Sequence, residues 1–320
     1  MLTRLGDAAR PWLARTPWTN VYGLARTILA LGTFATLAVS STDILFRPAV
    51  GQPEVPQCSG AADAGIFCLL GDRLEVARWI AMALLLVVAS GWRPRLTGVV
   101  HWWVANSFAF SITIPDGGDH LTAVLTFLLL PLTLTDRRRW HWAPAGDAEG
   151  APSAARDTAK LFAFSGLAVI RLQMAGVYFH AAVAKFGVAE WADGTALYYW
   201  LNDPVFGAPH WARSWLGPIL ENALAVAAIT WGSMLIELAL FLGLVVHRRF
   251  WKYLLPLGLV FHWAIAFSMG LLSFSTATSG ALILYLRPFD EEFAFARLPF
   301  RRRREREEPA AAPAAATPTA

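Results

Sequence analysis

The chain has 320 residues, of which 56% are hydrophobic and only 16% are charged, and its formal net charge is +4 at pH 7. This composition excludes an ordinary water-soluble domain, because one soluble core cannot hide so much apolar surface. It also argues against nucleic-acid binding, because the arginines fall between apolar runs and in a terminal cluster, as they do in membrane proteins.

Eight apolar runs are long enough, or nearly so, to cross a bilayer. A helix needs roughly 20 apolar residues to span the hydrocarbon, because unpaired backbone groups are costly in lipid. The runs are residues 21–39, 76–92, 96–114, 121–135, 161–184, 223–246, 253–271 and 272–286. The fourth and the last are the shortest. We therefore predict an all-α, multi-pass integral membrane protein with about eight transmembrane helices.

The basic residues predict which side of the membrane each connection faces, because Lys and Arg near span ends are retained in the cytoplasm. Basic residues gather in the N-terminal segment and in residues 93–95, 136–139, 247–249 and 301–304. Few occur in the connections 40–75, 115–120 and 186–222. This distribution predicts cytoplasmic N- and C-termini and three outer connections. The first run lacks a convincing cleavage site, so we expect an uncleaved span.

Composition also divides the chain into segments. We predict a cytoplasmic N-terminus at residues 1–20, a transmembrane bundle at 21–290, and a basic and then disordered cytoplasmic tail at 291–320. Within the bundle, residues 143–158 are rich in Ala, Gly, Pro and charge. That composition predicts a flexible inner linker between two four-span halves.

Cys58 and Cys68 are the two cysteines of the chain, and both fall in the first outer connection. The outer side is oxidising, so the sequence predicts a structural disulfide between them. A redox pair that exchanges with a secreted substrate is a second interpretation, although the spacing is not the CxxC of such pairs. Two unpaired thiols are the third.

Ionisable residues inside spans are functional candidates by default, because inserting a charge there costs about 2.5 to 3.5 kcal/mol. Helical spacing in the fifth run places Arg171, Tyr178 and Lys185 on one face, with Lys185 at the outer end. A lysine at this position can simply extend its ammonium to the interface. The other interpretation is a functional amine held inside the bundle.

Further polar residues lie within other runs: Arg26 in the first, Asn106 in the third, Glu237 in the sixth and His262 in the seventh. Pairing between helices explains each of them singly. Arg26 would then be the counter-ion of a buried carboxylate. Taken together, these residues favour a polar site within the bundle.

The second outer connection contains Asp116, Asp119 and His120 around two glycines. A carboxylate at this position can cap the following helix, so both aspartates can be turn and cap residues. An imidazole titrates near neutral pH and suits proton transfer if it is held against a substrate. Metal-ligand spacings such as HxxxH or HxxE do not occur, and we predict no metal site.

Some enzyme classes are disfavoured by missing motifs. The sequence has no P-loop, no GxGxxG that follows a strand, no HExxH and no GxSxG. ATP-driven pumping and standard hydrolase chemistry are therefore disfavoured.

Residues 173–199, with the sequence QMAGVYFHAAVAKFGVAEWADGTALYY, resemble the signature of the HTTM (horizontally transferred transmembrane) domain superfamily, which includes vitamin K-dependent γ-carboxylases. The turn 118–120, Glu237, and His262 with the following 267–274 segment occur in the matching order. Chain size, the Asp116 to Asp119 turn and the basic-aromatic segment 137–142 are most similar to the bacterial sporulation-delaying protein B family.

Members of that family help to convert a secreted precursor into a mature antimicrobial peptide toxin. The resemblance implies a multi-pass protein of the bacterial cell membrane that acts on an exported peptide precursor at its outer face. It implies that the partners, besides the precursor, are the lipid bilayer and a co-encoded protein. No nucleic-acid partner is expected. The catalytic candidates are then Lys185, His120, Asp119, Glu237 and His262, and the substrate-binding candidates are Asp116, Arg171, Gln173, Tyr178, His180, Trp191 and Tyr198.

The carboxylase resemblance implies an alternative, a quinone-dependent membrane enzyme with lyase or oxidoreductase chemistry and reduced menaquinone or vitamin K as cofactor. Lys185 aligns with the lysine proposed to deprotonate reduced vitamin K, and Trp191 and Tyr198 would desolvate it. The chain lacks the large outer domain of true carboxylases, so γ-carboxylation itself is not expected. An immunity or transport protein, whose charges only pair helices, is the third possibility.

Overall fold

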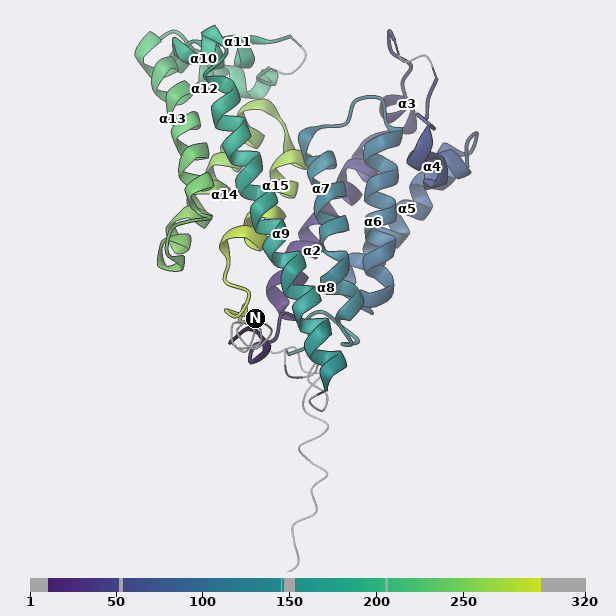
Figure 1. Cartoon of the computed structure of the whole chain (residues 1–320). Coiled ribbons are helices and arrows are strands. Elements are labelled where there is room, and N and C mark those ends of the chain that lie inside the picture. The colour runs from purple at the N-terminus through teal and green to yellow at the C-terminus, as the bar shows by residue number, and fades with distance from the viewer. Residues whose placement is uncertain (1–10, 52–53, 145, 147–152, 205–206, 295–320) are drawn as a thin grey trace, which may run out of the picture.

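A computed structural model describes residues 11–51, 54–144, 146, 153–204 and 207–294 of the chain. In these residues every regular element is a helix, and one isolated bridge joins Trp92 to Trp140. Figure 1 shows long helices packed side by side, with several short helices gathered at one end of the bundle. The predicted all-α fold is confirmed for the described part of the chain.

Helices coincide with all eight apolar runs. They are α2 (Asn20–Val39), α5 (Leu74–Ser90), α6 (Pro94–Ser111), α7 (Gly117–Leu128) with α8 (Leu130–Thr135), α9 (Ala154–Lys185), α13 (Ala223–Leu242), α14 (Trp251–Met269) and α15 (Leu272–Leu286). Among the described residues, five segments have both the length and the apolar composition of a membrane span. They are Asn20–Val39, Gly117–Thr135, Ala154–Lys185, Ala223–Leu242 and Arg248–Met269.

The boundaries of two helices differ from the predicted runs for local reasons. The helix of the fourth run begins at Gly117, because Asp116 caps it, and it is interrupted at Leu129, just before Pro131. Helix α9 begins at Ala154, within the segment expected to be a linker, and the Ser153 side chain accepts a hydrogen bond from its first turn. Residues 145 and 147–152 of that segment lie outside the described residues.

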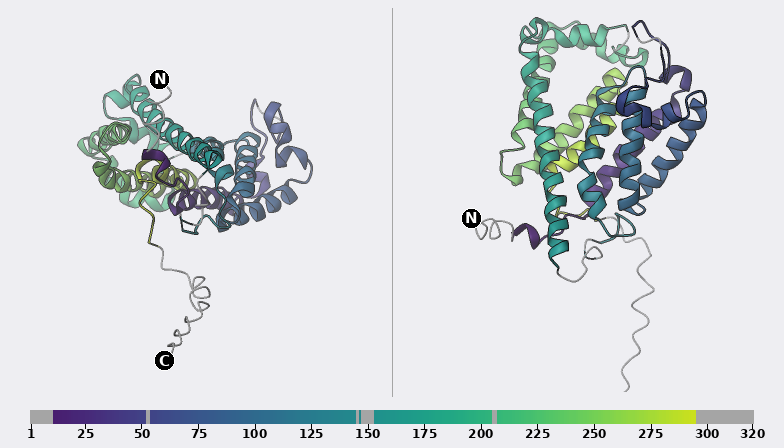
Figure 2. Two further views of the ribbon diagram at one scale, coloured as in Figure 1. Left: turned by 60° about the horizontal axis from the view of Figure 1, so that its bottom comes forward. Right: turned by 45° about the vertical axis from the view of Figure 1, so that its right-hand side comes forward.

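The three connections predicted to lie outside are at one end of the bundle (Figures 1 and 2). The first contains α3 (Thr42–Leu45), η1 (Gly60–Ala64) and α4 (Ile66–Leu69). The third contains α10 (Ala189–Ala192), α11 (Ala196–Asn202) and α12 (His210–Leu220). The described N-terminal residues and the 136–143 segment lie at the opposite end.

Helix α15 lies in the middle of the bundle and is buried along most of its length. It packs against α2, where Gly280 permits close approach: a Cβ atom there would lie 3.1 Å from the Ala25 carbonyl oxygen and 3.0 Å from Leu29. Small residues at such crossings are usual for helices in membranes, where close van der Waals packing drives association. This central helix positions α7, α9 and α14, which carry most of the candidate site residues.

Candidate functional site

Lys185, the last residue of α9, forms an ion pair with Glu237 of α13. Its Nζ atom lies 2.6 Å from both carboxylate oxygens of Glu237 and 3.1 Å from the carbonyl oxygen of Ala181. The ammonium also lies over the Trp191 ring, 5.0 Å from its centroid. The two charged side chains are 20% and 10% exposed, so the ammonium does not extend freely into the interface. The pair is shielded by protein but still accessible.

A second polar pair involves a residue of α9 that lies two helical turns nearer the N-terminus, about 10 Å from Lys185 along the helix. The hydroxyl of Tyr178 and Nε2 of His262 on α14 are 3.0 Å apart, and both residues are buried. Ser275 of α15 donates a hydrogen bond to the His262 carbonyl at 2.6 Å, while the His262 Nδ1 atom has no hydrogen-bond partner among the described residues. Tyr178 and Lys185 therefore face the same side of α9, as their spacing predicts.

Asp116 and Asp119 cap helix α7 by a reciprocal arrangement. The Asp116 carboxylate accepts hydrogen bonds from the backbone nitrogens of Gly118 and Asp119 at 2.7 and 2.9 Å, and Asp119 accepts one from the Asp116 nitrogen at 3.0 Å. Ser273 of α15 donates a further hydrogen bond to Asp116. The predicted cap role is confirmed. His120 is exposed, and its ring lies 5.9 Å from that of Phe110.

Phe274 connects this turn to the Tyr178–His262 pair. A Cβ atom on Gly118 would lie only 2.7 Å from the Phe274 Cα atom, so a glycine is required where α7 begins against α15. The Phe274 ring lies 5.4 Å from the His262 ring. The capped turn, Phe274, His262 and Tyr178 are thus a continuous series of contacts across four helices.

The structure does not bring every predicted residue to this group. Arg171 stacks on Trp251 with its guanidinium 4.5 Å from the ring centroid, and 14 residues of helix place it about 21 Å from Lys185. His180 and Tyr198 are exposed, and Gln173 is partly buried. Tyr198 packs edge-on against Tyr199 with their ring centroids 5.5 Å apart. Asn106 is also partly buried.

A second polar cluster, missed by sequence reasoning, lies at the opposite end of the bundle. Asp136 and Arg138 form an ion pair at 2.8 Å with fully buried side chains, and Tyr22 donates a hydrogen bond to Asp136. Arg26, also fully buried, donates to Thr97 at 2.6 Å instead of pairing with a carboxylate of the described residues, which corrects the expectation for it. The sequence signal for this cluster was Asp136, which immediately precedes the basic residues 137–139.

His141 belongs to the same cluster and is held in the bundle by close packing. Its backbone nitrogen donates to Gly91 at 2.9 Å, and its Nε2 atom lies 3.3 Å from Thr27 Oγ1. Burial, together with the charges of Arg26 and Arg138, lowers the pKa of His141 well below 6.5. The residue is therefore a neutral packing element and not a proton carrier near neutral pH.

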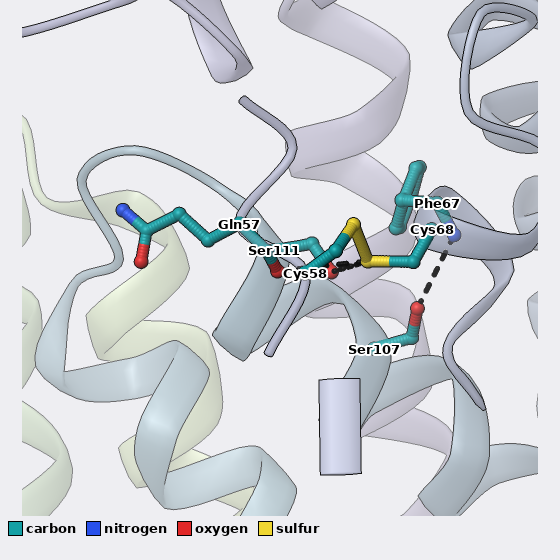
Figure 3. Close-up of a disulfide and its surroundings, with 6 residues drawn as sticks. All are labelled: Gln57, Cys58, Phe67, Cys68, Ser107 and Ser111. Atoms are coloured by element: carbon teal, nitrogen blue, oxygen red, sulfur yellow. Dashed lines mark hydrogen bonds between the residues drawn. A yellow bond between two sulfur atoms is a disulfide. The ribbon is translucent and has the colours of Figure 1, made fainter. Parts of the chain in front are cut away.

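The predicted disulfide joins Cys58 and Cys68, whose Cα atoms are 5.7 Å apart (Figure 3). The loop that it closes is attached to α6 at two places. The Gln57 nitrogen donates to the Ser111 carbonyl at 3.0 Å, and the Phe67 nitrogen donates to the Ser107 hydroxyl at 3.5 Å. The pairing prediction is confirmed, and the attachment fits a structural role.

Two proteins of Bacillus subtilis (strain 168) resemble the chain over most of its length. The uncharacterized protein YitO is 40% identical over 298 residues, which cover 92% of this chain and 94% of YitO. The sporulation-delaying protein SdpB is 36% identical over 278 residues, which cover 86% of this chain and 83% of SdpB. No protein-family model and no solved structure match the chain, so membership of the HTTM superfamily stays a prediction.

Proposed function

The chain belongs to the family of the sporulation-delaying protein SdpB, and on this premise we propose that it is a membrane protein that matures a secreted antimicrobial peptide. In this proposal an exported precursor reaches the end of the bundle that carries α10, α11 and α12. The chain acts there together with a co-encoded partner protein. Eight spans with cytoplasmic termini would place this end outside the cell, because the basic connections lie at the other end.

The observation that carries the proposal is the Lys185–Glu237 pair. A partly exposed ammonium and carboxylate can exchange partners with a peptide, because the lysine can bind a peptide carboxylate while the glutamate binds an amine or an amide nitrogen. A fully buried pair lacks this capacity. Trp191, which covers the ammonium, keeps water from weakening such contacts.

The neighbouring short helices offer a surface for an apolar peptide. Aromatic side chains of α11 and α12 are exposed between 45% and 59%: Tyr198, Tyr199, Trp200, Trp211 and Trp215. Aromatic rings with a polar edge favour the membrane–water interface, where a peptide leaving the bilayer would meet them. This surface and the ion pair are both at the same end of α9.

The experiment replaces Lys185 in a strain that produces the peptide. We expect Lys185→Ala to lower mature peptide in the culture medium at least tenfold, measured by mass spectrometry, while immunoblots show an unchanged amount of membrane protein. Arg95→Ala is the matched control, because it removes an exposed cation at the opposite end of the bundle. A full yield of mature peptide from the Lys185→Ala strain would exclude the proposal.

The quinone-dependent alternative assigns a different role to the same lysine. Two cavities in the described part of the chain lie at the opposite end of the bundle, and neither is lined by Lys185, Glu237, Tyr178 or His262. We therefore derive no step through a quinone. Purified protein supplied with reduced menaquinone and oxygen tests the alternative directly, since quinone epoxide would form only if that chemistry occurs.

Gene deletion separates the proposal from an immunity function. Loss of a maturation protein stops production of mature peptide and leaves the cells alive. Loss of an immunity protein leaves the mature peptide unchanged and makes the producing cells sensitive to it.

A further inference from the structure

A cavity of about 270 Å³ lies beside α9, near the end of the bundle opposite Lys185. Its walls are mainly apolar and include Trp12, Phe164, Ala168 and Phe289. Arg171 is the one charged residue among those that line it. The cavity therefore combines a long apolar surface with a single cation, which is the pattern that suits an amphiphilic anion.

Within the described part of the chain the Arg171 guanidinium forms no direct ion pair, and the Asp290 carboxylate attracts it only at longer range. One face stacks on Trp251, and the buried Nε atom has no hydrogen-bond partner. Asp290 follows the cavity residue Phe289 in the chain. Its carboxylate pairs with Arg15 at 3.5 Å and with Arg248 at 3.6 Å. A partly buried guanidinium with free donors is costly, and an oxyanion would satisfy it.

The surroundings of the cavity favour a phospholipid over a small soluble anion. An adjacent cavity is lined by four cations, Arg248, Arg249, Lys252 and Arg287. Arg248 pairs with Asp290 and Arg287 with Glu291, so the cations still outnumber the carboxylates by two. Such a basic cluster attracts anionic lipid headgroups. Leu161 of α9, which lines the cavity and is 43% exposed, extends its apolar surface along the helix.

We propose that this cavity binds one anionic phospholipid. Its phosphate would accept hydrogen bonds from the free edge of Arg171, and one acyl chain would lie along the apolar wall formed by Phe164, Ala168 and Phe289. Trp12 and Trp251 would contact the headgroup region, where tryptophan is enriched. This site does not depend on the proposed function, because it lies about 21 Å along α9 from Lys185.

The test uses the full chain in detergent with added dioleoyl phosphatidylglycerol or dioleoyl phosphatidylcholine. Native mass spectrometry should show one retained phosphatidylglycerol, and this lipid should raise the thermal unfolding midpoint more than phosphatidylcholine does. Arg171→Gln should weaken phosphatidylglycerol retention at least tenfold. Arg95→Gln, an equal loss of charge at an exposed position of α6, should leave it unchanged.

Ala168→Phe gives an independent test, since it fills the cavity while Arg171 stays in place. It should weaken retention as much as Arg171→Gln does, and Arg171→Lys should give an intermediate value because it loses the two-donor geometry. Retention of phosphatidylglycerol by Arg171→Gln and by Ala168→Phe at the level of the natural chain would overturn the proposal. Equal stabilisation by inorganic phosphate, or equal retention of phosphatidylcholine, would overturn it as well.

Discussion

Two groups of charged side chains lie within the bundle, and they differ in how completely the protein covers them. At one end, the side chains of Asp136 and Arg138 are 0% exposed, and each is held by several hydrogen bonds. At the other end, Lys185 and Glu237 are 20% and 10% exposed and hold mainly each other. The first group joins a connecting segment to the helices, whereas the second is partly exposed at the surface.

The degree of burial distinguishes a structural charged pair from a functional one more clearly than the presence of charge does. Burying a charged pair costs several kcal/mol of desolvation per ion, and the cost is recovered only through close geometry and additional hydrogen bonds. The Asp136–Arg138 pair has both, including the bond that Arg138 donates to the Ala143 carbonyl at 2.7 Å. We therefore expect substitutions in that group to affect folding first.

The largest stability effect is expected for Asp136→Asn. The substitution leaves the buried Arg138 guanidinium without its carboxylate, and breaking a buried pair in this way costs about 3 to 5 kcal/mol. Thermal unfolding in detergent and the amount of protein in membranes should both fall. Glu75→Gln is the control, because Glu75 also pairs with an arginine, Arg78, but is 51% exposed. Equal effects of the two substitutions would contradict the comparison.

Removal of the disulfide should have the next largest effect, and a local one. Replacing Cys58 and Cys68 together by Ser removes a cross-link over ten residues, which stabilises by about 3 kcal/mol in the chain-entropy model. Limited proteolysis within residues 54–70 should become roughly 100-fold faster. The thermal midpoint of the helix bundle should change much less. A large fall of that midpoint would show that the loop supports the whole bundle.

A smaller effect is expected where the 136–143 segment contacts α5. Gly91 has a φ of +84°, and a Cβ atom there would lie 2.3 Å from the His141 Cδ2 atom. Gly91→Ala should therefore destabilise the protein by about 1 to 3 kcal/mol. Gly176→Ala on α9 is the matched control, because nothing lies within 4 Å of a Cβ atom there. The control should be neutral or slightly stabilising in the same unfolding assay.

The helices could be predicted from the sequence because hydropathy is a local property. The disulfide and the helix cap at Asp116 were also predictable, since each depends on residues close together in the chain. Packing between distant segments was not. Lys185 and Glu237 were separate candidates, but they are 52 positions apart in the sequence and no pattern joins them.

The same limit applies to the surroundings of the arginines. Positive charge near a span end predicts the side of the membrane, but not whether the side chain turns toward solvent or into the bundle. Arg138 turns inward to Asp136, Arg26 bonds to a threonine, and Arg171 stacks on Trp251. Each arrangement depends on which helix lies opposite, so only the folded chain reveals it.

The smallest stability effect is expected when both members of the Lys185–Glu237 pair are replaced, as in Lys185→Met with Glu237→Leu. Exchange of an ion pair for apolar residues of similar volume is often nearly neutral, so the unfolding free energy should stay within about 1 kcal/mol of the natural chain. The Lys185→Met variant alone should be less stable, because it leaves the Glu237 carboxylate unpaired.

The double variant also tests what the pair does. If the charges only hold α9 against α13, the double variant should produce mature peptide at the normal level, because the helix contact is kept. If the pair binds the exported precursor, mature peptide should be absent although the protein is folded and present in the membrane. Mass spectrometry of the culture medium and an unfolding curve from the same strain distinguish the two outcomes. Lost production by a stable double variant would assign the Lys185–Glu237 pair to peptide maturation and leave the buried Asp136–Arg138 pair with the structural role.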